Sequence, residues 1–161
     1  MIGSETTVRI KHLLAAFAIQ AAVVGVAAQA PSFAQAAAPA RLNPNTATAQ
    51  QISALPHMTP ALAATIQSKK PFANTAAFDA AIGASLDAKQ KSELYAQLFV
   101  PISLNRATAA EINLIPGMTR RMVHEFEEYR PYTSLAQFDK EIGKYVSKDE
   151  VARLRSYVAL D

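Results

Sequence analysis

Two adjacent arginines, Arg120 and Arg121, follow a proline–glycine turn in the second half of this 161-residue chain. Guanidinium groups can pair with phosphate oxygens through two parallel hydrogen bonds. The hydroxyl of Thr119 can cap a helix that begins at Arg120, whose first backbone N–H groups have no acceptor within the helix. Together these groups predict a phosphate site made by Gly117, Met118, Thr119, Arg120 and Arg121.

A solvated helix start is the alternative interpretation of the two arginines. In that case Arg121 is balanced by Glu125, which lies one turn further along the same helix. Lys69 and Lys70 leave a similar choice open, because cations are favoured at a helix C-terminus as well as beside phosphates.

Other polar residues indicate no further chemistry. His57 is expected to be a partly exposed turn residue, because no carboxylate or second histidine lies at a metal-binding spacing. His124 and the acidic residues between 125 and 128 are expected on a solvated helix face. The chain has no cysteine, no nucleophile–base pair and no glycine-rich nucleotide loop. The sequence therefore predicts no enzyme activity, no metal, no cofactor and no small-molecule substrate.

The turn before the arginines connects two predicted helices. Thr108 and Glu111 form a capping box, which predicts that a short helix begins after Thr108. Pro116 ends this helix, and Gly117 tolerates a positive φ. Thr119 then caps the next helix, so the segment is a hairpin of two helices.

The same pattern occurs twice along the chain. Residues 43–101 align with residues 103–161 at a constant offset of sixty positions and without a gap. The identical pairs include Asn45/Asn105, Thr48/Thr108, Pro56/Pro116, Thr59/Thr119, Pro71/Pro131, Phe78/Phe138 and Gly83/Gly143. One register held over this length indicates an internal duplication.

Each repeat is predicted to contain about four short helices and no strand, so the expected fold class is all-α. The predicted N-caps are Thr48, Thr59, Asn74 and Asp87 in the first repeat and Thr108, Thr119, Ser134 and Ser147 in the second. In the second helix of the second repeat, Met122 and Phe126 are expected on the core face. Glu125 and Glu128 are expected outside.

Residues 1–36 predict a secretory signal peptide. Arg9 and Lys11 precede an apolar run over residues 13–28, and the small residues at 32–36 match a signal-peptidase site. Residues 37–42 are then a flexible leader, and the exported protein is expected in the periplasm. An uncleaved membrane anchor is the alternative, for which the apolar run is slightly short.

Charge limits the expected strength of nucleic-acid binding. The formal net charge of the whole chain is +3. The second repeat has nine basic and nine acidic residues, and the first repeat carries a net charge of only +1. Because phosphate neutralisation supplies most non-specific affinity, a nearly neutral protein is expected to bind nucleic acids weakly.

The repeated motifs resemble the helix-hairpin-helix family, specifically the ComEA type of exported competence proteins. The resemblance is carried by NPNTATAQQISALPHMTP and NRATAAEINLIPGMTR, and by the later segments PFANTAAFDAAIG and PYTSLAQFDKEIG. It implies tandem helix-hairpin-helix repeats, with repeat 1 at residues 43–101 and repeat 2 at residues 102–161.

The resemblance also implies a function. Members of this family bind the backbone of double-stranded DNA without sequence preference, through N–H groups beside two hairpin glycines. Repeat 2 keeps Gly117 and has Thr119 in place of the second glycine, whereas repeat 1 has His57 and Thr59 at these positions. A side chain there blocks close approach to a phosphate. The resemblance therefore implies weak DNA binding by the second hairpin, in uptake or handling of external DNA, and a structural first hairpin.

A protein-interaction module that kept the fold and lost DNA binding is the alternative function. The photosystem II extrinsic lumenal subunit belongs to a related lineage, and the segments IPGMTRRMV and EYRPYTSL resemble it. Such a module docks onto an exported or membrane protein. The nearly neutral charge and the missing hairpin glycines favour this alternative.

Overall fold

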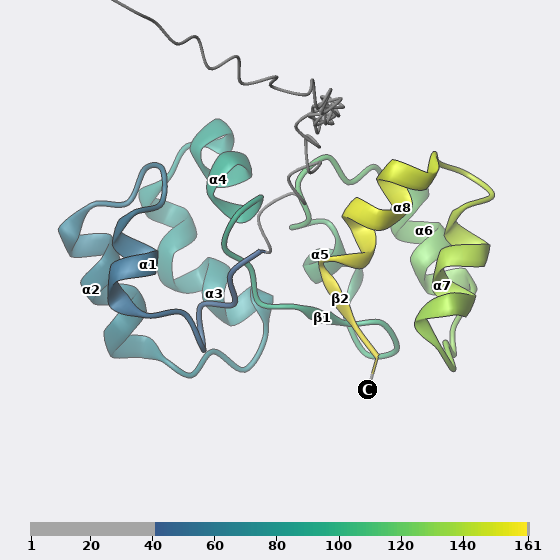
Figure 1. Cartoon of the computed structure of the whole chain (residues 1–161), viewed down its shortest axis with the longest axis horizontal. Helices are drawn as coiled ribbons and strands as arrows, with labels where there is room; N and C mark the ends of the chain where they lie inside the picture. The colour runs from purple at the N-terminus through teal and green to yellow at the C-terminus, as the bar shows by residue number, and fades with distance from the viewer. Residues whose placement is uncertain (1–40, 161) are drawn as a thin grey trace, which may run out of the picture. The chain divides into compact units, whose positions relative to one another are not determined.

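Helices predominate in the computed structural model, which describes residues 41–160 (Figure 1). The predicted signal peptide and most of the predicted leader lie outside these residues. No helix within residues 41–160 is long and apolar enough to cross a membrane. The expected predominance of helix is confirmed, with one short pair of strands added to it.

The first half contains four α-helices and one 3-10 turn. They are α1 (Ala49–Ser53), α2 (Pro60–Lys69), α3 (Thr75–Ile82), η1 (Gly83–Ser85) and α4 (Ala88–Tyr95). Each α-helix begins directly after its predicted N-cap, whose side-chain oxygen accepts a hydrogen bond from the backbone N–H three residues further on.

The second half contains four α-helices in the same order. They are α5 (Ala109–Ile112), α6 (Arg120–Glu128), α7 (Leu135–Ile142) and α8 (Lys148–Arg155). All four predicted N-caps again accept a backbone hydrogen bond. At α5 the capping box is complete, because the Glu111 carboxylate also accepts from the backbone N–H of Thr108 at 2.8 Å.

A short parallel pair of strands contradicts the prediction that the fold has no strand. Strand β1 (Ile102–Ser103) pairs with β2 (Val158–Ala159), with Ile102 opposite Val158. An isolated parallel bridge joins Leu42 and Leu98, at positions sixty residues earlier. Strands of two residues are too short to produce the alternating pattern by which strands are predicted.

Positions sixty residues apart also make the same long-range hydrogen bonds. The side-chain amide of Asn45 donates to the carbonyl of Phe72 at 2.9 Å and accepts from its N–H at 2.8 Å. Asn105 bonds Tyr132 in the same two ways, at 3.0 and 2.7 Å. The peptide bonds before Pro71 and Pro131 are both cis, and positions 57 and 117 both have a positive φ.

The two halves contact each other through aromatic side chains. In the first half, rings of Phe78, Tyr95 and Phe99 follow one another with centroids 5.6 and 5.9 Å apart. Phe99 then meets Tyr157 of the second half edge-to-face, with centroids 5.0 Å apart. The guanidinium of Arg41 lies 3.1 Å from the centroid of the Tyr157 ring, and its Nε donates to the carbonyl of Ala96.

The expected orientation of α6 is only partly correct. Met122 and Phe126 are buried, as predicted, and Glu128 is exposed. Glu125 was expected on the outside, but only 6% of its surface is exposed. The prediction is wrong because it considered α6 alone, whereas Arg121 and Tyr145 also lie against this carboxylate.

Candidate nucleic-acid interface

The second hairpin is a tight turn between α5 and α6. The backbone N–H groups of Ile115 and Met118 donate to the carbonyls of Ile112 and Ile115, each at 3.1 Å. Gly117 has a φ of +75°, in the left-handed region where a side chain is strained. A Cβ at this position would have room, because its nearest neighbour would be Arg153 Nη2 at 3.7 Å. The backbone conformation, rather than space, therefore requires glycine here.

Arg153 of α8 holds this turn in place. Its Nη1 donates to the carbonyl oxygen of Pro116 at 2.8 Å, and its Nε and Nη2 donate to the Glu150 carboxylate at 2.7 Å each. These hydrogen bonds raise the pKa of Arg153 and lower that of Glu150. Both groups therefore stay charged at neutral pH. The sequence analysis missed this contact, because Arg153 lies far from the turn along the chain.

Helix α6 begins directly after the turn. The Thr119 hydroxyl accepts a hydrogen bond from the N–H of Met122 at 3.3 Å. The remaining N–H groups of the first helical turn have no acceptor within the helix, and they carry the positive end of the helix dipole. The predicted site residues Gly117, Met118 and Thr119 thus lie together where an anion is favoured.

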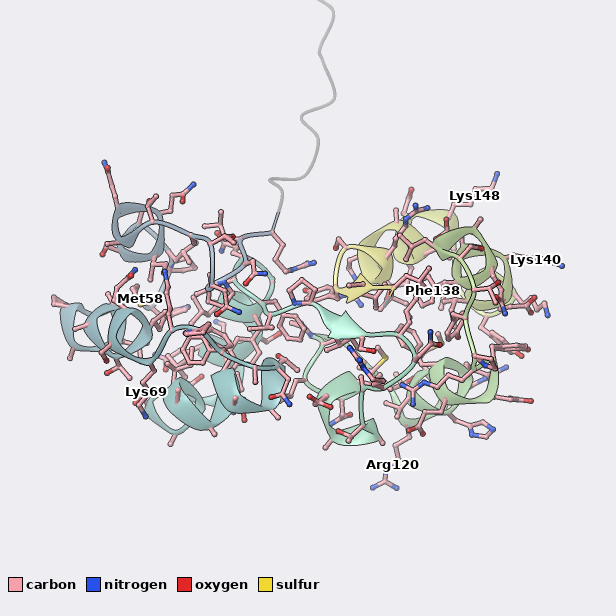
Figure 2. The ribbon with its side chains drawn as sticks, turned by 90° about the horizontal axis from the view of Figure 1, so that it is seen from below. Met58, Lys69, Arg120, Phe138, Lys140 and Lys148 are labelled. Atoms are coloured by element: carbon pink, nitrogen blue, oxygen red, sulfur yellow. The ribbon has the colours of Figure 1, made fainter. Side chains whose placement is uncertain are left out.

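The two arginines of the predicted site differ in their surroundings. Arg120 is exposed, has no ion-pair partner among residues 41–160, and projects away from the ribbon in Figure 2. Arg121 places Nε 3.7 Å from Glu125 Oε1 and its guanidinium 5.2 Å from the centroid of the Tyr145 ring. Arg121 is therefore balanced by an acid on its own helix, as the alternative interpretation expected.

A cluster of tyrosines continues from Arg121. The hydroxyls of Tyr145 and Tyr129 lie 2.6 Å apart. The pKa of Tyr145 is raised by this hydrogen bond first and by a hydrogen bond with Glu125 next. Because its raised pKa keeps the Tyr145 phenol protonated at neutral pH, Tyr145 contacts Glu125 without adding a charge.

The first hairpin has a different composition at the same place. His57 takes the position of Gly117 with a φ of 61°, and its Nε2 lies 2.5 Å from Glu93 Oε2. The prediction of a partly exposed turn residue is confirmed, but its carboxylate partner was not foreseen. Glu93 is the counterpart of Arg153, so the same position of α4 and α8 contacts both hairpins. The repeats align Glu93 with Arg153, so both have a charged residue at this position. The sequence analysis did not use this signal for the two hairpin contacts.

Within residues 41–160 no group of three histidine or acidic side chains could hold a metal ion. His124 lies on the surface, as predicted, with Nε2 3.5 Å from Glu128 Oε2. Lys69 is exposed, whereas Lys70 Nζ donates to the carbonyl of Ala47 at 2.6 Å. Lys70 is therefore hydrogen-bonded within the fold, whereas Lys69 lies on the surface.

Comparisons of the chain with protein-family models, with curated proteins and with solved structures found no match. The assignment of a function rests on the sequence motifs and on the geometry of the second hairpin. That geometry combines a left-handed glycine, the start of a capped helix and one free guanidinium, and it suits contact with a single phosphate group.

Proposed function

We propose that residues 43–161 form two tandem helix-hairpin-helix repeats of the ComEA type that bind double-stranded DNA without sequence preference. The contact is made by the second hairpin, at Gly117, Met118, Thr119, Arg120 and Arg121. The observation that carries the proposal is the left-handed Gly117 directly before the capped start of α6, with Arg120 exposed beside it.

The repeat assignment is supported by matched structure at matched positions. Helix order, N-caps, the asparagine hydrogen bonds and the positive φ at the hairpin all recur after sixty residues. Each half joins its short helix α1 or α5 to the next helix through a turn that contains a proline, Pro56 or Pro116, as the family's hairpin does.

The proposed contact is made with a single phosphate group of the DNA backbone. Gly117 lets the DNA backbone approach the turn, the first N–H groups of α6 point toward a phosphate oxygen, and Arg120 pairs with it. Arg121 contributes less, because Glu125 already neutralises it. The expected affinity is weak, in the range of about 10⁻⁴ to 10⁻⁶ M typical of non-specific binding at physiological salt.

The proposed role is binding rather than catalysis, and it takes place in the periplasm during uptake or handling of external DNA. Export rests on the signal-peptide pattern of residues 1–36. An uncleaved anchor would keep the same hairpin at the membrane surface on the same side.

A protein-interaction module is the second candidate function. The pairing of Arg121 with Glu125 favours it, and so does the first hairpin, where Pro60 and Ala61 replace the two arginines. A module of this kind would use the repeats as a rigid scaffold for another exported or membrane protein.

Fluorescence anisotropy with labelled duplexes separates the two functions. Residues 37–161 are titrated at low salt into two duplexes of equal length and unrelated sequence. Equal binding to both supports a non-specific backbone contact. Absence of binding to either duplex would remove DNA as the ligand and favour a protein partner.

A further inference from the structure

A groove between α7 and α8 combines an apolar floor with a basic rim. Its volume is about 380 Å³, and its floor is formed by Gly143, Val146, Val151 and Ala152. The rim is formed by Asp139, Lys140, Lys148 and Arg155. In Figure 2, Lys148 projects toward the top of the view and Lys140 toward its right edge, whereas Arg120 projects toward the bottom, and no residue of the second hairpin lines the groove. The groove is therefore separate from the hairpin proposed to bind DNA.

In the first half, side chains occupy the place equivalent to this groove. Lys91 Nζ lies 2.8 Å from Asp79 Oδ1, and the Tyr95 hydroxyl donates to the same oxygen at 2.6 Å. A Cβ built on Gly83 would lie only 2.7 Å from Lys91 Nζ, so this lysine covers the glycine.

In the second half the covering residues are replaced. Val151 stands at the position of Lys91, and Arg155 stands at that of Tyr95. The nearest side-chain atom to a Cβ on Gly143 would be Val151 Cγ2, at 3.7 Å. The shorter valine leaves the surface between the helices open.

Positive charge exceeds negative charge at the rim. Arg155 pairs with Asp139 across the groove, so these two charges cancel. Lys148 has no ion-pair partner among residues 41–160, and Lys140, whose side chain is 78% exposed, reaches Glu141 only at 4.0 Å. Asp149 is exposed on α8 but does not line the groove. The four rim residues therefore carry a net charge of +2, from the two lysines.

We propose that this groove binds a short acidic segment of a partner protein, which inserts one apolar side chain between α7 and α8. Carboxylates on either side of that side chain pair with Lys140 and Lys148. A protein segment fits better than DNA, because most of the exposed lining is apolar. This apolar part has no hydrogen-bond donor for the oxygens of a phosphate backbone, whereas it can bury an apolar side chain. The proposal goes beyond DNA binding and does not depend on it.

The probe is an acetylated and amidated pentapeptide in which one phenylalanine is flanked on each side by two acidic residues. It is titrated into the ¹⁵N-labelled protein, and backbone amide shifts are followed by NMR. The expected result is saturable shifts at Gly143, Val146, Val151 and Ala152, with Gly117 unaffected. No shifts, or shifts spread over both halves, would overturn the proposal.

Two variants test the groove and its charge separately. Val151→Lys restores the covering residue of the first half and adds a positive charge, so loss of peptide binding would show that the open floor is required. Equal or tighter binding would mean that charge alone attracts the peptide, and would overturn the proposal. The double variant Lys140→Glu/Lys148→Glu leaves the floor intact and should bind about tenfold more weakly.

Controls keep the outcome decisive. Lys69→Glu changes an exposed lysine of the first half and should leave peptide binding unchanged, with the spectrum confirming a folded protein. A second peptide with serine in place of phenylalanine should bind at least several-fold more weakly, because the apolar anchor is missing.

If Val151→Lys does not fold, the double lysine variant and this serine peptide decide the question. Shifts at the groove from a DNA duplex but not from the peptide would assign it to nucleic acid and contradict the proposal.

Discussion

The side chain of Arg153 donates a hydrogen bond from Nη1 to the carbonyl oxygen of Pro116 at 2.8 Å. This bond connects the last helix of the chain to the turn proposed to contact DNA. The equivalent position in the first half is Glu93, which contacts His57 of the first hairpin. In both halves a charged residue of the fourth helix thus fixes the hairpin, although the two residues have opposite charge.

Replacing Arg153 with alanine should therefore loosen the second hairpin. The change removes the hydrogen bond to Pro116 and leaves Glu150 without its partner, with an expected loss of about 1–2 kcal/mol in the free energy of unfolding. Urea unfolding followed by circular dichroism measures this loss. Lys148→Ala is the matched control, because Lys148 lies on the same helix and has no ion-pair partner among residues 41–160. Equal stability of the two variants would show that Arg153 does not hold the turn.

Replacing Gly117 with alanine should strain the same turn. The φ of +75° costs an alanine about 1–2 kcal/mol, and the added Cβ also obstructs the approach of a phosphate. Both the free energy of unfolding and the affinity for a duplex should fall. The comparison is His57→Gly, which relieves a side chain at a φ of 61° but removes the contact with Glu93. If Gly117→Ala retained full duplex affinity, close approach at this position would not be needed.

The tyrosines should make the protein sensitive to alkaline pH. Burial raises the pKa of Tyr95, Tyr132 and Tyr157, and hydrogen bonds with Tyr129 and Glu125 raise that of Tyr145. Since the folded pKa values lie above the unfolded value of about 10, their stabilising contribution is complete below pH 10 and is lost as the pH rises above it.

Absorbance at 295 nm, recorded with circular dichroism across the same pH range, tests this expectation. Tyrosinate should form together with loss of helix, at a pH above 10. Ionisation of most tyrosines near pH 10 in a protein that keeps its helices would contradict the proposed burial and hydrogen bonding.

Local sequence signals predicted the helices well because each depends on a few neighbouring residues. Thr108 with Glu111 marks the start of α5, and proline at 71 and 131 lies just beyond the ends of α2 and α6. The alignment at an offset of sixty then carried every helix start from one half to the other.

Features that depend on distant residues were not predicted. The parallel contact of Ile102 with Val158 joins the start and the end of the second half, and nothing in either two-residue segment marks it as a strand. Glu125 is buried because Tyr145 and Arg121 lie against it, and helix periodicity alone could not foresee that. The turn before a capped helix at residues 117–119 was foreseen from the sequence, but the different surroundings of Arg120 and Arg121 required coordinates.

Duplex affinity of the Arg120→Ala variant as a function of salt tests the central claim most directly. Fluorescence anisotropy is recorded for residues 37–161 of the original protein, Arg120→Ala, Arg121→Ala and Lys69→Ala at several salt concentrations. If Arg120 neutralises one phosphate, its removal weakens binding and makes the slope of log K against log salt shallower by about 0.9. Arg121→Ala should have a smaller effect and Lys69→Ala none. An unchanged slope in Arg120→Ala, or a loss of equal size in all three variants, would contradict binding through the second hairpin.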